Sequence, residues 1–168
     1  MFTIPYVQGP KILSLSRCVR RDVRMVKFRN NCVYNRSDQD GINVLFGYRF
    51  GWRNKVCLSW KYSNVSKNID LFASYLIDGI YSEQFLMSMD LEKAYIVTFQ
   101  MNYDKGNIDI TCQTALDRGY RMHTTIRTGG MGLDKLFFTW CLTWGLGPSM
   151  GNIVTKPEGI MELKVDRI

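Results

Sequence analysis

Apolar and polar side chains alternate along most of this chain. In 55–62, the even positions are Val, Leu, Trp and Tyr, whereas the odd positions between them are Cys, Ser and Lys. Successive residues of a β-strand point to opposite faces of a sheet, so a period of two predicts strands with one apolar face. The pattern predicts about nine or ten strands in all. The other segments with this period are 11–19, 22–34, 42–50, 69–77, 94–103, 108–112, 119–127, 135–145 and 159–168.

Short turns join these segments. The turn at 104–107 contains Gly106, which tolerates the positive φ of a tight connection, and it predicts a β-hairpin over 94–112. The segment 81–93 is the only plausible short helix, with a strand followed by a turn as the alternative. Parallel sheets need long crossover helices, for which the chain has no room. We therefore predict an all-β fold, an antiparallel two-sheet β-sandwich.

Length and charge suggest how the chain is organised. Its 168 residues are typical of one domain, and its formal net charge is +7. Residues 1–40 contain eight basic side chains but only three acidic ones. We expect 1–40 to form basic N-terminal strands or an arm, packed on or extending from the sandwich, and 41–168 to form the β-sandwich domain.

The basic N-terminal segment is a candidate docking surface, because positive charge attracts acidic protein surfaces and phosphates. Its basic residues alternate with apolar ones, unlike those of nucleic-acid-binding arms. An acidic protein neighbour is therefore favoured over nucleic acid, and a solvated strand face is the third alternative. The candidate partner-docking residues are Arg17, Arg20, Arg21, Arg24, Lys27 and Arg29.

Signatures of catalysis and metal binding are weak. His123 is the single histidine, and a catalytic histidine needs a hydrogen-bonding partner. The glycines in 129–132 lack the Gly-Lys-Ser/Thr ending of a phosphate-binding loop. The five cysteines are odd in number and lack C-x-x-C spacing, so we expect buried free thiols in a reducing compartment. We predict no catalytic residue, no metal and no cofactor.

One aromatic residue and several polar ones suggest a possible glycan site. Trp52 lies in a Gly-Trp-Arg-Asn turn, where an exposed ring can stack on a sugar. Trp60, Trp140 and Trp144 share the apolar register and are predicted to be core residues. A solvated sheet face is the alternative to a binding site. The candidate glycan-binding residues are Trp52, Arg49, Lys61, Arg121, His123 and Arg127.

The C-terminal part contains a distinctive run of residues. Residues 140–152 read Trp-Cys-Leu-Thr-Trp-Gly-Leu-Gly-Pro-Ser-Met-Gly-Asn, and 157–163 read Pro-Glu-Gly-Ile-Met-Glu-Leu. This run resembles the closing part of concanavalin A-like jelly-roll domains from gut Bacteroidetes and their phages, and the hairpin at 94–112 is similar to their central hairpin. The resemblance extends over 41–168 and implies a jelly-roll fold. That fold hosts lectins, glycan lyases and structural modules.

The first functional hypothesis is a non-enzymatic structural or adhesive β-sandwich, namely a phage virion component that decorates the head, belongs to the capsid or accompanies a fibre. Its partners would be copies of itself or capsid and fibre neighbours. A carbohydrate-binding module is the alternative, and a nucleic-acid-contacting virion protein is the third. We expect assembly in a reducing cytoplasm, with no membrane contact, because no secretory signal or apolar run of spanning length is apparent.

Overall fold

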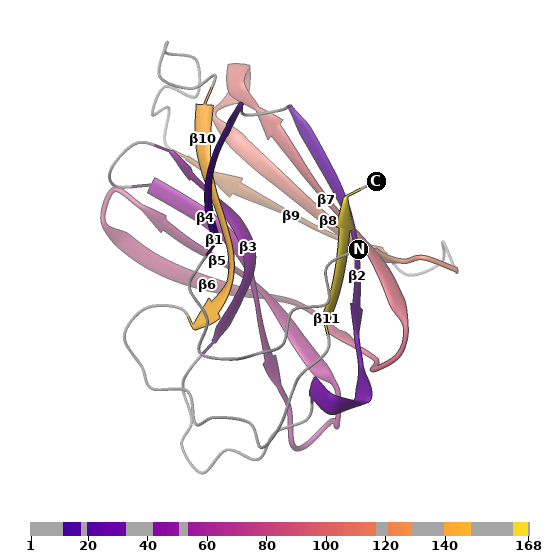
Figure 1. Cartoon of the computed structure of the whole chain (residues 1–168). Coiled ribbons are helices and arrows are strands. Elements are labelled where there is room, and N and C mark those ends of the chain that lie inside the picture. Colours follow the sequence, from indigo (N-terminus) through magenta and orange to yellow (C-terminus); the bar gives the residue numbers. More distant parts are fainter. Residues whose placement is uncertain are drawn as a thin grey trace.

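The computed structural model describes residues 12–17, 20–32, 42–50, 54–116, 121–128, 140–148 and 163–167. Within these residues the chain is almost entirely β-structure, and every neighbouring pair of strands is antiparallel. The strands form two sheets that face each other (Figure 1). The predicted fold class, an antiparallel two-sheet β-sandwich, is confirmed.

The first sheet has six strands in the order β1-β10-β3-β4-β5-β6, and the second has five in the order β11-β2-β7-β8-β9. The strands of the first sheet are β1 (Ile12–Arg17), β10 (Trp140–Pro148), β3 (Asn43–Phe50), β4 (Asn54–Tyr62), β5 (Ile69–Ile77) and β6 (Ile80–Met89). Those of the second are β11 (Leu163–Arg167), β2 (Arg21–Phe28), β7 (Ala94–Asn102), β8 (Asn107–Thr114) and β9 (Arg121–Arg127). Two 3-10 turns are η1 (Asn30–Cys32) and η2 (Tyr103–Lys105).

The segment 81–93 forms a strand and a turn, so the helical alternative is wrong. A tight turn precedes it, where Asp78 and Gly79 have φ values of 54° and 84°. Two positive φ values in succession match the twist of a two-residue hairpin, and they place β6 directly beside β5. The predicted hairpin at 94–112 is also confirmed, with Gly106 at φ 59°.

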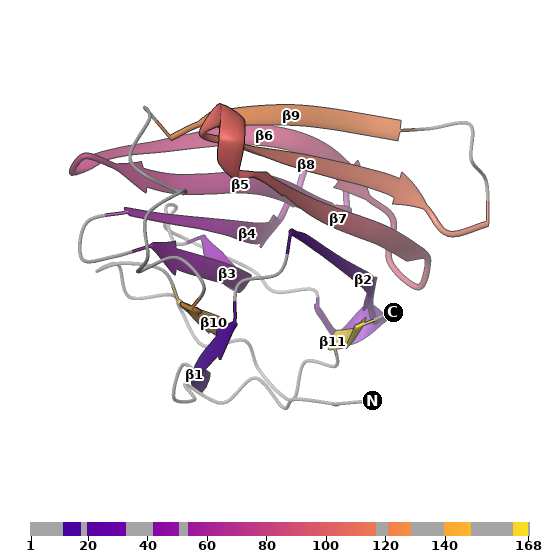
Figure 2. The same ribbon diagram turned by 90° about the horizontal axis from the view of Figure 1, so that it is seen from above.

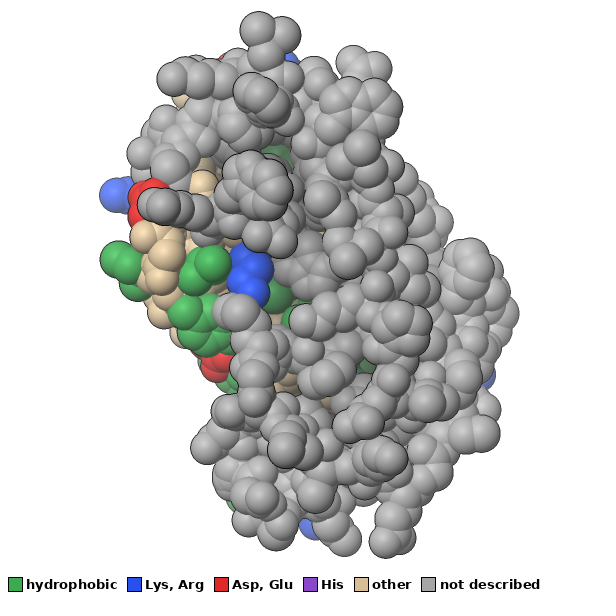
Figure 3. Space-filling view, turned by 60° about the vertical axis from the view of Figure 1, so that its left-hand side comes forward, with side chains coloured by type: hydrophobic (Ala, Val, Ile, Leu, Met, Phe, Trp, Pro, Cys, Tyr) green, Lys and Arg blue, Asp and Glu red, His purple; other side chains and the backbone are tan. Residues whose placement is uncertain are grey.

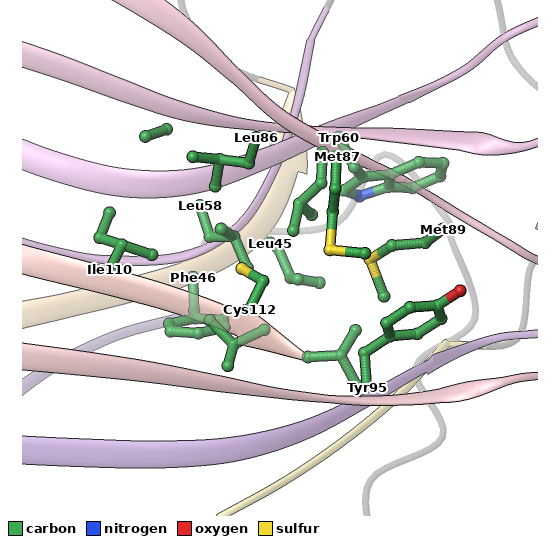
Figure 4. Packing of buried hydrophobic residues seen from close by; sticks show 14 of the residues in the cluster. Leu45, Phe46, Leu58, Trp60, Leu86, Met87, Met89, Tyr95, Ile110 and Cys112 are labelled. Atoms are coloured by element: carbon green, nitrogen blue, oxygen red, sulfur yellow. The ribbon is translucent and has the colours of Figure 1, made fainter. Parts of the chain in front are cut away.

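The apolar positions of the two sheets meet in the interior and form one core (Figure 4). Each alternating strand turns its apolar face inward, so that Val56, Leu58 and Trp60 of β4 lie opposite the inward residues of β7 and β8. The largest fully buried side chains are Phe28, Phe99, Leu45, Leu58, Ile69, Leu71, Leu86, Met89, Met101, Ile108, Ile110 and Val26.

A strict period of two predicts Val44, Phe46 and Tyr48 on one apolar face of 42–50, but β3 departs from it at its start. A register shift lies between Val44 and Phe46, and Val44 stands opposite Ser59, on the outward side of β4. Leu45 instead joins the core. A β-bulge inserts one residue into a strand and reverses the side on which the preceding residues lie, so the period of two predicts Phe46 and Tyr48 correctly but not Val44.

The sandwich is closed along one side. Strand β9 ends one sheet and strand β6 ends the other, and the two lie next to each other in Figures 1 and 2. There the Thr124 hydroxyl of β9 donates a hydrogen bond of 2.8 Å to Oε1 of Gln84 in β6. This contact joins the two outer edges where apolar packing ends.

A charged cluster crosses the interior between β2 and β3. Asp22 is 2% exposed, and Arg24 donates to its Oδ2 atom through Nε and Nη2, each at 3.0 Å. The Tyr48 hydroxyl from the facing sheet donates to the same Oδ2 atom. The Arg24 guanidinium also lies 4.3 Å from the ring centroid of Phe46. A carboxylate buried in a sandwich is stable only with such partners.

We expect removal of this carboxylate to destabilise the fold strongly. Asp22→Ala leaves the largely buried guanidinium of Arg24 without its counter-charge, which costs about 3 kcal/mol. The double variant Asp22→Ala/Arg24→Met removes both charges and is expected to recover part of that loss. Urea denaturation of the wild type, both single variants and the double variant measures the coupling. Additive losses in the double variant would contradict the assigned pair.

Candidate functional site

The outer face of the six-stranded sheet carries aromatic rings on β5 and β6 and an ammonium group on β4, which we together call the aromatic strip: Phe72, Phe85, Tyr81 and Lys61. Phe72 stands opposite Phe85 across the β5–β6 ladder, and their rings pack edge to face with centroids 5.7 Å apart. The Lys61 ammonium lies 4.9 Å from the Phe72 centroid. Phe85 is 53% exposed and Tyr81 is 42% exposed, so ring surface remains open to solvent.

Hydrogen-bonding groups border the aromatic strip. Ser88 of β6 donates to Oδ1 of Asp70 on β5 at 2.6 Å. The Tyr81 hydroxyl donates to Oε1 of the exposed Glu83. Figure 3, which looks toward this side of the molecule, shows hydrophobic side chains gathered beside basic and acidic ones within the described surface. Apolar rings thus lie within one patch with carboxylates and an ammonium group.

Small polar side chains lie beneath Tyr81 and Glu83. Ser59 and Ser74 are 0% and 1% exposed, and Cys57 lies between them, donating its thiol hydrogen to the Ser74 carbonyl at 3.2 Å. Burial raises the pKa of Tyr81, and its hydrogen bond to Glu83 adds to the shift. The Tyr81 phenol therefore stays protonated and remains a donor.

The two carboxylates on this face, Asp70 and Glu83, lie far apart along the sheet. On this face Asp70 stands opposite Ser88, and Glu83 stands opposite Ser74, which lies four residues further along β5. Four residues of strand span about 13 Å. Hydrolysis at a glycosidic bond uses two carboxyl groups about 5–10 Å apart. Asp70 and Glu83 therefore do not form such a pair.

The outer face of the five-stranded sheet has a different character, and we call it the basic face: Arg21, Arg121, His123 and Arg127 around Asp109. Asp109 accepts hydrogen bonds from Asn102 at 2.6 Å and from the Thr125 hydroxyl at 2.5 Å. His123 Nε2 lies 3.6 Å from Oδ1 of Asp109. The surrounding outward positions on β7 and β8 are Thr98, Gln100, Thr111 and Gln113.

The candidate glycan-binding residues do not come together. Lys61 belongs to the aromatic strip, whereas Arg121, His123 and Arg127 lie on β9 in the other sheet, facing outward on the opposite side of the sandwich. Arg49 is in β3, and its backbone alone is described; Trp52 lies outside the described residues.

The candidate docking residues are also divided. Arg20 and Arg21 are exposed, and Arg24 points inward to Asp22. Lys27 and Arg29 both contact Oε2 of Glu92, at 3.1 Å and 2.9 Å. The remaining candidate, Arg17, lies in β1, where the backbone alone is described. Arg24, Lys27 and Arg29 thus serve intramolecular contacts, while Arg20 and Arg21 remain available to a partner.

The sequence analysis missed the aromatic strip. Phe72 and Phe85 are brought together by the β5–β6 ladder, and the alternative of a helix at 81–93 obscured that pairing. The strip can be recognised from the outward-facing positions of β5 and β6, but only once these two segments are known to be neighbouring strands.

The remaining predictions on chemistry concern thiols, metals and membranes. Cys32, Cys57 and Cys112 are buried, as expected, and form no disulfide with one another; burial raises the pKa of the Cys112 thiol to about 12. Cys18 lies outside the described residues, and for Cys141 the backbone alone is described. In the described part of the chain, no group of three potential metal ligands gathers. No helix among those residues is long and apolar enough to span a bilayer.

Comparison with solved structures identifies the fold. A xylan β-1,4-xylosidase from Bacillus halodurans matches with a TM-score of 0.52 at 12% identity, over 88% of this chain and 27% of that one. A β-1,3-glucanase from Mycobacterium marinum matches with a TM-score of 0.51 at 14% identity, over 92% of this chain and 66% of that one. The chain has a concanavalin A-like jelly-roll fold. This chain thus corresponds to only part of each enzyme.

A pentraxin from Limulus polyphemus also matches, with a TM-score of 0.44 at 13% identity, over 97% of this chain and 73% of that one. This score is too low to bear on function. No protein-family model and no curated protein matches the sequence. At these identities, the likeness to the two glycosidases concerns the fold.

Glu92 makes the stability of the β6–β7 turn dependent on pH. The Asn30 backbone amide, Lys27 and Arg29 hold its pKa at about 2, below the ordinary 4.5. A carboxyl group whose pKa is lower in the folded state stabilises the protein above its unfolded pKa and loses that contribution as pH falls. We expect stability to decline from about pH 4.5 toward pH 2.

Urea denaturation of the wild type and Glu92→Gln at pH 7, 4 and 2.5 tests this assignment. We expect the wild type to be the more stable protein at pH 7 and the difference to shrink at pH 2.5. A difference that stays constant across this range would show that Glu92 acts through packing rather than through its charge.

Proposed function

We propose that this protein is a non-enzymatic, adhesive β-sandwich that binds carbohydrate at the aromatic strip. The observation that carries the proposal is the exposed Phe85 ring, held edge to face against Phe72, with carboxylates and an ammonium group beside it. Sugars present apolar C–H faces and a rim of hydroxyl groups. A rigid ring bordered by charged acceptors and donors complements both features.

The ring surface is preorganised, which favours affinity. Phe85 contacts Phe72 on one side, and the Lys61 ammonium covers Phe72 on the other. Both phenylalanines lie on paired strands instead of on a loop. Because neither ring has to be ordered when a ligand binds, little conformational entropy is lost.

Soluble β-1,3-glucan and β-1,4-xylan are suitable first ligands, because the two enzymes with the same fold are described as a glucanase and a xylosidase. The wide spacing of Asp70 and Glu83 along the sheet supports binding without turnover.

A second candidate function, supported by a different observation, is a structural role in a phage particle. Arg20 and Arg21 are adjacent and exposed, and neither makes an ion pair with any described residue. We propose that they dock the protein on an acidic neighbour in the capsid or fibre, which would present the aromatic strip outward as an adhesin. Charged residues at the rim of an interface direct association and fix orientation.

We expect Phe85→Ala to weaken glycan binding about tenfold, since an aromatic contact contributes roughly 0.5–1.5 kcal/mol beyond its buried area. Isothermal titration with the glucan and the xylan, preceded by a glycan array, measures the effect. Leu116→Ala is the matched control, because Leu116 is a 99% exposed apolar residue away from the strip. Equal binding by both variants, or no glycan bound by the wild type, would reject the proposed site.

We expect Arg20→Glu/Arg21→Glu to reduce incorporation into particles severalfold through charge reversal at the docking contact. Particles assembled with each variant in competition with the wild type are purified, and occupancy is measured by mass spectrometry. Lys67→Glu/Lys105→Glu applies the same change of charge at two other exposed positions. Equal incorporation of both double variants would remove the docking role.

A further inference from the structure

The three arginines of the basic face differ from the paired cations elsewhere in the described structure, because Asp109 at the centre of this face forms its ion pair with His123 and none with them. Elsewhere Arg24 pairs with Asp22, Lys27 and Arg29 with Glu92, and Lys93 with Asp90. Arg21, Arg121 and Arg127 are exposed, and no described residue makes an ion pair with any of them.

The ladder register fixes where these charges lie. Arg21, Gln100, Asp109 and Thr125 stand in one row across β2, β7, β8 and β9, so Arg21 and β9 are about 14 Å apart. Arg121 and Arg127 lie six residues apart on β9, which corresponds to about 20 Å. Three guanidinium groups thus surround a field of polar side chains that has the Asp109 carboxylate at its centre.

We infer that the basic face is the docking surface for an acidic protein, and this inference extends the docking role proposed for Arg20 and Arg21 to a whole sheet face. Arginine is enriched in protein interfaces, and a polar field edged by separated charges offers the mixed donors and acceptors that another protein surface can match.

Nucleic acid fits this face less well. Asp109 places a carboxylate at its centre, supported by Asn102 and Thr125, where a phosphate backbone would be repelled. The described outward positions of this sheet carry no Phe, Tyr or Trp ring on which a base could stack, and the imidazole of His123 lies beside the Asp109 carboxylate. The cations also stand apart and do not form the continuous track that a phosphate chain follows.

The test measures binding of poly-L-glutamate and of duplex DNA to the full chain at equal ionic strength. We expect tighter binding of poly-L-glutamate, and we expect Arg121→Gln/Arg127→Gln to weaken it about tenfold. Lys55→Gln/Lys67→Gln removes the same charge from the six-stranded sheet and its β4–β5 turn, and it should leave binding nearly unchanged. Backbone amide shifts on titration should concentrate in β7, β8 and β9.

Three results would overturn the inference. Equal loss in both double variants would mean that binding follows net charge and not this face. Tighter binding of DNA through the same arginines would assign the face to nucleic acid, and absence of binding to either polymer would leave it a solvated surface. Glycan titration of Arg121→Gln/Arg127→Gln tests this inference separately from the carbohydrate-binding proposal. This variant should bind glycan as the wild type does, because the aromatic strip lies on the opposite side of the sandwich.

Discussion

The burial of two apolar sheet faces against each other is the constraint on which the structure depends. Residues such as Phe99 and Leu58 leave water only when both sheets are present, because neither sheet alone can cover its own apolar face. The inward-facing side chains of every alternating strand are therefore required for the core. The outward-facing side chains have no role in the core, and they differ between the two sheets.

The interior cluster of Asp22, Arg24 and Tyr48 shows how a charge is accommodated under that constraint. The carboxylate takes hydrogen bonds from a guanidinium on its own strand and from a phenol on the facing sheet, and the guanidinium rests on Phe46. Such a cluster contributes little net stability compared with apolar packing. Its hydrogen bonds join β2 of one sheet to β3 of the other across the core.

Alternation alone predicts the strands, the hairpin at 94–112 and most inward residues, because these depend on local spacing. It does not predict which sheet each strand joins, since that depends on pairing between distant segments. Lys61 and Arg127 both read as outward polar residues, yet they lie on opposite sides of the molecule. The bulge beside Val44 and the pairing of Phe72 with Phe85 are likewise set by neighbouring strands, and so the aromatic strip emerges only from the fold.

The Tyr48–Asp22 hydrogen bond has a mechanical consequence. When a pulling force is applied between the two sheets, it acts across the interior. Apolar contacts there yield gradually and give no directional resistance. A phenol linked to a carboxylate from the opposite layer acts as a cross-brace, because it must break before the layers can slide. Resistance to shear would then reside in a few atoms next to β2, far from the surfaces that are being pulled.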